Sequence, residues 1–270
     1  MSEVKINVNT VKQQLAAGGV VYGTWVSTVG NPAIIRMIAA AGFDAVFLDT
    51  EHGPFSLETI SALCEMARAS HVVPIVRSYD RNGHLINRIQ DIGAMGMIFP
   101  HIESRAEVDD VLHWMLYPPA GERGSTSVSA PADWAVVPGD VMKSFINDNM
   151  LLAIQIESKE AVENLESIID GGGIDLVEVG RNDLSTSFGV PLQFSHPLVL
   201  EALDQVVAIC RERGIAVGTN CKSLSDADEM LQRGVRHIGY SSDRHILTGA
   251  YYQAIAGLKK SADTLGAVSP

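Results

Sequence analysis

A chain of 270 residues with 46% hydrophobic and 19% charged side chains can build a large internal core without disulfide bonds. The formal net charge of −12 argues against nonspecific nucleic-acid binding, which needs Lys and Arg to neutralise phosphates. No uninterrupted run of about 18 apolar residues occurs, so the sequence predicts neither a transmembrane helix nor a membrane partner.

The cysteines and the N-terminus indicate a reducing compartment. Cys64, Cys210 and Cys221 are odd in number and show no metal-finger spacing, so they are expected to be small, buried or half-buried residues. The N-terminal sequence MSEVKINVNTVKQQL lacks the apolar segment of a signal peptide. We therefore expect a cytoplasmic protein.

The chain repeats one unit along its length: a short β-branched run, a polar turn and a longer stretch with a period of 3.6 residues. The expected strands, in chain order, are residues 20–26, 44–49, 73–77, 95–100, 151–157, 174–180, 215–219 and 237–240. The expected helices include residues 32–41, 56–70, 82–92, 105–116 and 246–259, with one more ending at glycines 171–173. Gly42 and Gly93 are helix stop signals, and Ser56 is a helix N-cap.

Two segments depart from this repeat. Residues 117–149 are rich in Pro, Gly, Ser and Ala, and long stretches of this kind are usually functional or disordered. We expect this segment to fold over one end of a barrel, with a helix over residues 141–147. The last ten residues, SADTLGAVSP, are expected to form a frayed polar tail.

The strand pattern predicts the fold class. Near-continuous apolar strands that alternate with helices are typical of a parallel sheet buried on both faces. Eight repeats favour closure into a single α/β domain, a (β/α)8 TIM barrel over residues 1–270. The competing open doubly wound sheet would be favoured by a GxGxxG turn after the first strand, and the sequence there, WVSTVGNP, has none.

Polar residues follow five of the apolar strands, at the barrel end where such folds carry their chemistry. They are Asp49, Glu51 and His52, then Arg77, then His101 and Glu103, then Gln155 and Glu157, and finally Asp183. Acids, an imidazole and a guanidinium at one barrel mouth predict a site for a hard cation and an anionic substrate. The remaining histidines, His237 and His245 among them, are expected to be packing or surface residues.

Glu157 and Asp183 are the candidate metal ligands. They finish neighbouring strands, which lie about 4.8 Å apart, so both carboxylates could bind one ion. Two carboxylates with open positions fit Mg²⁺, Mn²⁺ or Co²⁺ better than zinc. Alternatively, each acid caps the helix that follows it.

His52 and Arg77 are the candidate catalytic side chains. His52 lies three residues after Asp49, whose carboxylate would orient the ring and raise its basicity, although a loop histidine can also be purely structural. Arg77 ends an apolar strand and needs an anionic partner. That partner is either a substrate carboxylate or enolate, or a neighbouring acid.

The segments FLDTEHGP, PIVRSYD, RIQDIGAMGMIFPHIES, YPPAGERG, AIQIES and VEVGRNDLS together resemble the HpcH/HpaI aldolase family, over roughly residues 18–258. The resemblance implies reversible aldol cleavage of 2-oxo-4-hydroxy acids to pyruvate and an aldehyde, with a divalent metal. It implies that His52 is the proton-accepting base and that Arg77 stabilises the transition state. Glu157 and Asp183 match the metal ligands.

The same resemblance implies further roles. Gln155 and the backbone around Asn182 and Asp183 match the pyruvate-binding positions. Asp91 matches an acid that raises the basicity of the histidine, although it precedes the fourth strand and should lie at the opposite end of its own barrel. The resemblance implies that a neighbouring subunit supplies this acid, and therefore a homo-oligomer, a trimer or a hexamer.

Two positions depart from the family pattern. Arg181 stands where relatives often have proline, and STSVSAPADW stands where relatives often carry an arginine. Both departures are expected near the aldehyde rather than near the pyruvate.

Three alternative functions stay open from the sequence. A Schiff-base aldolase would use Lys159 or Lys222 as its amine. A CoA-thioester lyase of the citrate lyase β type would use the same barrel superfamily. A noncatalytic barrel would only bind a small oxo acid.

Overall fold

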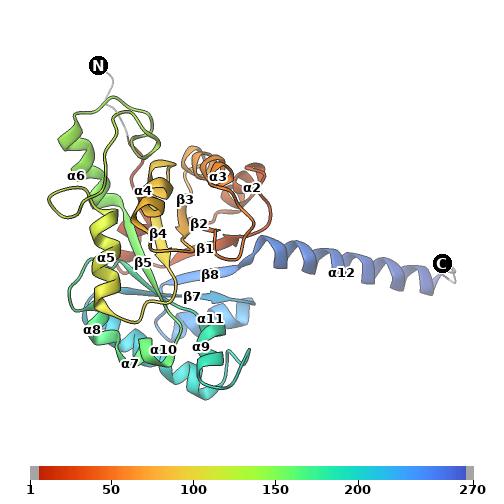
Figure 1. Cartoon of the computed structure of the whole chain (residues 1–270). Helices are drawn as coiled ribbons and strands as arrows, with labels where there is room; N and C mark the ends of the chain where they lie inside the picture. Colours follow the sequence, from red (N-terminus) through yellow and green to blue (C-terminus); the bar gives the residue numbers. More distant parts are fainter. Residues whose placement is uncertain (1–5, 266–270) are drawn as a thin grey trace.

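The computed structural model of the protein describes residues 6–265 and contains a closed barrel of eight parallel strands (Figure 1). Each strand pairs with the next in the chain, and β8 closes the barrel against β1. The strands are β1 Val21–Val26, β2 Ala45–Asp49, β3 Val73–Arg77, β4 Gly96–Phe99, β5 Leu151–Ile156, β6 Leu176–Val179, β7 Ala216–Cys221 and β8 His237–Ser242. The expected single (β/α)8 barrel is confirmed, with strand bounds within a few residues of those expected.

Helices connect successive strands and surround the barrel (Figure 1). They are α1 Thr10–Ala16, α2 Ala33–Ala41, α3 Leu57–Ala69, α4 Gly83–Asp91, α5 Arg105–Met115, α6 Gly139–Asn149, α7 Lys159–Glu163, α8 Leu165–Ile169, α9 Arg181–Ser187, α10 Pro197–Glu212, α11 Leu224–Gln232 and α12 Asp243–Thr264. The single helix expected before the glycines at 171–173 is two short helices, α7 and α8. Residues 181–185, expected to be a loop, begin α9.

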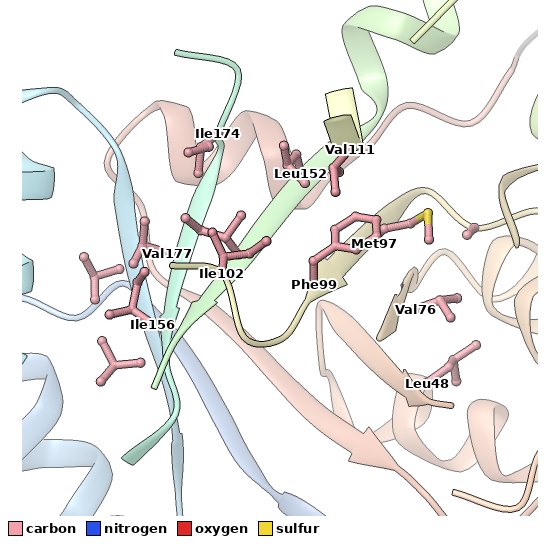
Figure 2. Packing of buried hydrophobic residues seen from close by; sticks show 14 of the residues in the cluster. Leu48, Val76, Met97, Phe99, Ile102, Val111, Leu152, Ile156, Ile174 and Val177 are labelled. Carbon is pink, nitrogen blue, oxygen red and sulfur yellow. The ribbon is translucent and has the colours of Figure 1, made fainter. Parts of the chain in front are cut away.

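Apolar side chains on alternating strand positions separate into two cores. The outer core fills the space between strands and helices, and Figure 2 shows Met97, Phe99 and Leu152 within it. The inner core fills the barrel and includes Phe47 and Ile75. Burial on both faces explains why the strands read as nearly continuous apolar runs.

The short helix α1 closes the N-terminal end of the barrel. Its Val11 and Leu15 belong to the inner core. Asn9 begins the helix, accepting a hydrogen bond from the amide of Lys12 (3.0 Å) and donating one to the carbonyl of Met95 (2.8 Å). Because this end is filled, the opposite end is where a ligand can enter.

The segment 117–149 covers the closed end of the barrel, near the start of the chain (Figure 1). Asp133 forms an ion pair with Arg68 at the end of α3 (2.8 Å), and Arg68 also donates to the carbonyl of Pro131 (3.1 Å). Within one chain the STSVSAPADW stretch therefore ends far from the strand ends that carry the predicted site, and its expected position near the aldehyde stays a prediction. The helix expected over residues 141–147 is longer and forms α6.

The last helix, α12, extends away from the barrel instead of packing against it (Figure 1). Its apolar side chains are exposed, with Tyr251, Tyr252 and Leu258 at 71%, 72% and 67%. The helix begins three residues earlier than expected and continues to Thr264, so the first residues of the predicted tail are helical; residues 266–270 lie outside the described part. Within residues 6–265, every helix is too short or too polar to cross a membrane.

Replacing Asn9 with alanine should lower the free energy of unfolding by about 2 to 3 kcal/mol, because a helix cap and the partner of a buried carbonyl are lost together. Urea denaturation measures this change. Ser56→Ala is the matched control, since Ser56 caps α3 at an exposed position and should cost about 1 kcal/mol. Equal losses in the two variants would contradict a contribution from the Asn9–Met95 hydrogen bond.

Candidate active site

A cavity of about 520 Å³ opens at the carboxyl ends of the strands. The predicted residues that line it are Asp49, His52, Arg77, Gln155, Asn182 and Asp183. Glu157 lies against its wall, because a Cβ built on Gly180 would be 2.6 Å from Oε2 of Glu157. The structure therefore brings together every predicted site residue except Asp91.

Arg77 is held by two carboxylates from the end of β2. Its Nε and Nη2 donate to the two carboxylate oxygens of Asp49 (3.0 and 2.8 Å), and its Nη1 lies 3.1 Å from Oε2 of Glu51. The guanidinium also stacks over the ring of Trp25 at 4.7 Å. In this structure the anionic partner of Arg77 is thus a neighbouring acid.

Asp49 holds the loop of His52, not its ring. Oδ1 of Asp49 accepts the backbone N–H groups of Glu51 and His52 (both 3.1 Å), and within the described chain no hydrogen bond joins Asp49 to the imidazole. Burial acts to raise the pKa of Asp49, but the hydrogen bonds and charge of Arg77 outweigh it and lower the pKa. The expected orientation of the His52 ring by Asp49 is corrected: Asp49 positions Arg77 instead.

Glu157 forms a second set of contacts across the cavity. Its Oε1 accepts the backbone N–H of His101 (2.8 Å) and lies 2.9 Å from Nδ1 of the same residue. Nε2 of His101 lies 3.3 Å from Oε1 of Glu51, so His101 bridges two acids. The sequence analysis placed Glu51 and His101 after strands but assigned neither a role. Their position at strand ends that meet at the same barrel mouth was the signal that could have identified them.

The two candidate metal ligands lie close enough to repel each other. Burial raises the pKa of Glu157, and the negative charges of Asp183 and Glu51 raise it further against the opposing effect of His101. Asp183 belongs to the first turn of α9 and lines the cavity. A cation between Glu157 and Asp183 would remove this repulsion.

The donor set fits a hard divalent cation that keeps open positions. Carboxylate oxygens are the ligands that Mg²⁺ and Mn²⁺ take, with water or substrate completing the coordination shell. Among residues 6–265, no group of three or more His, Cys, Asp or Glu side chains is arranged to hold a metal ion. A cation held by the two carboxylates of Glu157 and Asp183 would keep positions for water or a substrate.

Asp91 lies elsewhere in the chain. It ends α4, before β4, and accepts a hydrogen bond from Nη2 of Arg123 (2.9 Å), whose guanidinium stacks on Tyr117 at 4.4 Å. This position is at the closed end of the barrel, as the sequence implied. Within one chain Asp91 therefore takes no part in the cavity.

Basic side chains also line the mouth of the cavity, among them Arg181, which was expected near the aldehyde, and Lys222, the amine of the Schiff-base alternative. Arg181 donates to both carboxylate oxygens of Asp226 (2.9 and 2.8 Å), which lowers the pKa of that acid against the effect of burial. Lys222 lies 3.2 Å from the ring centre of Phe194, and burial followed by the charge of Arg181 lowers its pKa. His245, expected at the surface or in packing, lines the cavity too.

The comparisons with known proteins agree with this geometry. The HpcH/HpaI aldolase/citrate lyase family model matches residues 22–250. A 2-keto-3-deoxy-L-rhamnonate aldolase from Escherichia coli O1:K1 / APEC is 30% identical over 254 residues, which cover 93% of each chain.

Two solved structures show the same fold across nearly the whole chain. An HpcH/HpaI aldolase from Desulfitobacterium hafniense DCB-2 is 30% identical, with a TM-score of 0.88 over 92% of this chain and 96% of that one. Citrate synthase SbnG is 28% identical, with a TM-score of 0.84 over 94% of this chain and 98% of that one.

Asp49→Asn should lower the free energy of unfolding at pH 7 by about 3 kcal/mol, because one partner of a buried ion pair is removed. The folded-state pKa of Asp49 lies below its unfolded value, so the carboxylate stabilises the fold fully above about pH 4 and loses this effect as the pH falls through the folded-state pKa. The difference between wild type and variant, measured by urea denaturation at a series of pH values, should shrink below pH 4. The exposed Asp228→Asn is the control, and a pH-independent difference would contradict the assignment.

Proposed function

The chain belongs to the HpcH/HpaI aldolase/citrate lyase family, and we propose that its cavity cleaves a 2-oxo-4-hydroxy acid reversibly to pyruvate, or a related 2-oxo acid, and an aldehyde. Relatives over most of its length are aldolases, and the activity class is that of a carbon–carbon lyase. The observation that carries the assignment is the convergence of Arg77, Glu157, Asp183 and His52 on one cavity.

The oxo acid would bind between β3 and β5. Arg77 offers a guanidinium whose position is fixed by Asp49 and by stacking on Trp25, so little reorganisation is needed when negative charge develops on the substrate. The side chain of Gln155 and the backbone around Asn182 face the same cavity. These groups would orient the carboxylate and the keto oxygen.

Glu157 and Asp183 would hold the divalent cation, Mg²⁺, Mn²⁺ or Co²⁺. When bound, such an ion supplies Lewis-acid stabilisation for an enolate. His101 donates to Glu157 and would keep that carboxylate oriented.

His52 would move the proton of the 4-hydroxyl group, removing it in cleavage and returning it in synthesis. Its side chain is more than half exposed and faces the cavity, with Nε2 3.9 Å from Oε2 of Glu51. Because Asp49 fixes only the backbone of this loop, the ring is free to turn toward an aldehyde oxygen.

We propose a homo-oligomer, a trimer or a hexamer, in which a neighbouring copy places its Asp91 near His52. The exposed apolar residues of α12 support assembly, since single-chain proteins rarely leave so much apolar surface uncovered. A cytoplasmic location is proposed because all three cysteines are buried free thiols.

Exchange of the C3 protons of pyruvate with deuterated solvent tests the proposed activity, because enolate formation needs no aldehyde. The protein should exchange pyruvate protons, lose this activity with EDTA and recover it with added Mn²⁺. Glu157→Gln should slow exchange by about 100-fold or more, since several kcal/mol of charge stabilisation are removed. Arg77→Met should slow it by about 10²- to 10³-fold, and the exposed Glu160→Gln is the control. Proton NMR measures each rate.

Two outcomes would support the alternatives. Full exchange in EDTA, with covalent inactivation by borohydride and pyruvate, would indicate a Schiff-base enzyme; Lys222 lines the cavity and is the lysine to test. Pyruvate binding without any exchange would indicate a noncatalytic barrel.

Replacing Tyr251 and Leu258 with aspartate should dissociate the assembly, because two charges would enter its apolar interface. Light scattering coupled to size-exclusion chromatography measures the mass, with wild type expected at three or six chains. The control is Lys259→Asp on the same helix. A wild-type protein that elutes as a monomer would contradict the proposal.

A further inference from the structure

Two acid–base pairs contain buried side chains to which the mechanism above gives no role. Inside the barrel, Oε2 of Glu178 on β6 lies 2.9 Å from Nδ1 of His237 on β8, and a Cβ on Gly218 of β7 would collide with both side chains. This first pair is enclosed, since its members are 2% and 0% exposed. The second pair joins Arg123 to Asp91 at the closed end of the barrel, and its acid reaches the surface. Only the second pair can therefore contact another chain.

The guanidinium of Arg123 is buried and has one acceptor. Its side chain is 0% exposed and stacks on the ring of Tyr117 at 4.4 Å. Tyr117 is fixed in turn, because its backbone N–H donates to Oδ1 of Asn147 on α6 (2.9 Å). In the described part of the chain Nε and Nη1 of Arg123 have no hydrogen-bond partner, and Nη2 donates to Asp91 (2.9 Å). Because a buried charge is costly unless it is paired, this contact holds both side chains in place.

The loop after α5 is built to bring Arg123 to this position. The backbone N–H groups of Glu122 and Arg123 donate to the carbonyls of His113 (2.7 Å) and Leu116 (3.0 Å). A Cβ on Gly121 would lie 2.5 Å from each of the same two carbonyl oxygens. Only glycine therefore allows the loop to approach the end of α5 so closely. The segment YPPAGERG, which the proposed mechanism leaves without a role, is thus a rigid holder for one cation.

Asp91 lies where a carboxylate benefits from such a cation. It is the last residue of α4, at the negative end of the helix dipole. Its side chain is 39% exposed, and among the described residues only Arg123 contacts it, through Oδ1, so that Oδ2 can accept another hydrogen bond. Covering this carboxylate with a neighbouring copy would disfavour its charged form, whereas an adjacent guanidinium favours that form. Arg123 therefore compensates the burial that assembly would impose on Asp91.

We propose that Arg123 is a positioning residue for the reaction: it keeps Asp91 charged and oriented, so that Oδ2 accepts a hydrogen bond from the imidazole of His52 in a neighbouring copy. The inference rests on the proposed function and adds the residue that makes the shared acid effective. The imidazole takes the proton of the 4-hydroxyl group in cleavage and returns it in synthesis, and Arg123 touches no substrate. Loss of Arg123 should therefore affect the step that His52 performs and leave enolate formation from pyruvate intact.

Two reactions of the same cavity separate these steps. With Mn²⁺ present, cleavage of 4-hydroxy-2-oxopentanoate to pyruvate and acetaldehyde uses His52, whereas C3 proton exchange of pyruvate does not. Arg123→Met should lower kcat for cleavage by about 10- to 100-fold, a part of the roughly 10²- to 10⁴-fold that a general base contributes. KM for cleavage and the exchange rate should stay at their wild-type values. Arg211→Met, at an exposed position of α10, is the matched control.

A double-mutant cycle shows whether Arg123 acts through Asp91. In an Asp91→Asn background, Arg123→Met should cause no further loss of cleavage, because the carboxylate that it supports is already neutral. Arg123→Lys keeps a cation beside Asp91 and should restore most of the cleavage rate. Circular dichroism and light scattering check fold and assembly. If Arg123→Met fails either check, the neutral Arg123→Gln takes its place in the cycle.

The possible outcomes distinguish this inference from the proposed function. Unchanged cleavage in the Arg123 variants, an equal loss of cleavage and exchange, or losses that multiply in the cycle would each overturn the inference while the aldolase stands. A wild type that exchanges pyruvate protons but cleaves neither this acid nor 4-hydroxy-2-oxobutyrate would overturn the role of His52 and the inference with it. A wild type that performs neither reaction would overturn the proposed function itself.

Discussion

The ion pair between Arg77 and Asp49 is the contact on which the site depends. The two residues are register partners on β2 and β3, so the sheet itself aligns a planar guanidinium with a carboxylate. Asp49 also accepts the backbone N–H groups that begin the His52 loop. One carboxylate therefore fixes both the guanidinium of Arg77 and the start of the loop that carries His52. Both contacts depend on the register in which β2 pairs with β3.

The sequence predicted what strand periodicity and strand ends determine. Each apolar strand that ends in polar residues delivers them to the same barrel mouth, which is why His52, Arg77, Gln155 and Asp183 line one cavity. The sequence could not predict which side chains form pairs. Whether Asp49 contacts the His52 ring or Arg77 is decided by the register of neighbouring strands. The direction of α12 and the anchoring of residues 117–149 were equally out of reach, since both depend on tertiary contacts and not on local pattern.

The two sides of the cavity differ in how their charged groups are paired. On one side Arg77 is paired with two carboxylates, Asp49 and Glu51; on the other, Glu157 is kept beside Asp183 and is compensated only in part by His101. The repulsion between Glu157 and Asp183 gives a cation a place to bind, while the partners of Arg77 keep the guanidinium fixed. An anionic substrate bridging both sides would meet positive charge at each end.

Gly218 limits which substitutions this barrel can accept during evolution. Any larger side chain there would collide with Glu178 and His237, so the acid, the imidazole and the glycine form one inherited unit. A lineage that lost the pair could fill the space with apolar side chains on β6 and β8, and only then would position 218 tolerate a methyl group. Loss of the pair should therefore proceed through coordinated replacements on three adjacent strands, with single steps held back by the crowding between them.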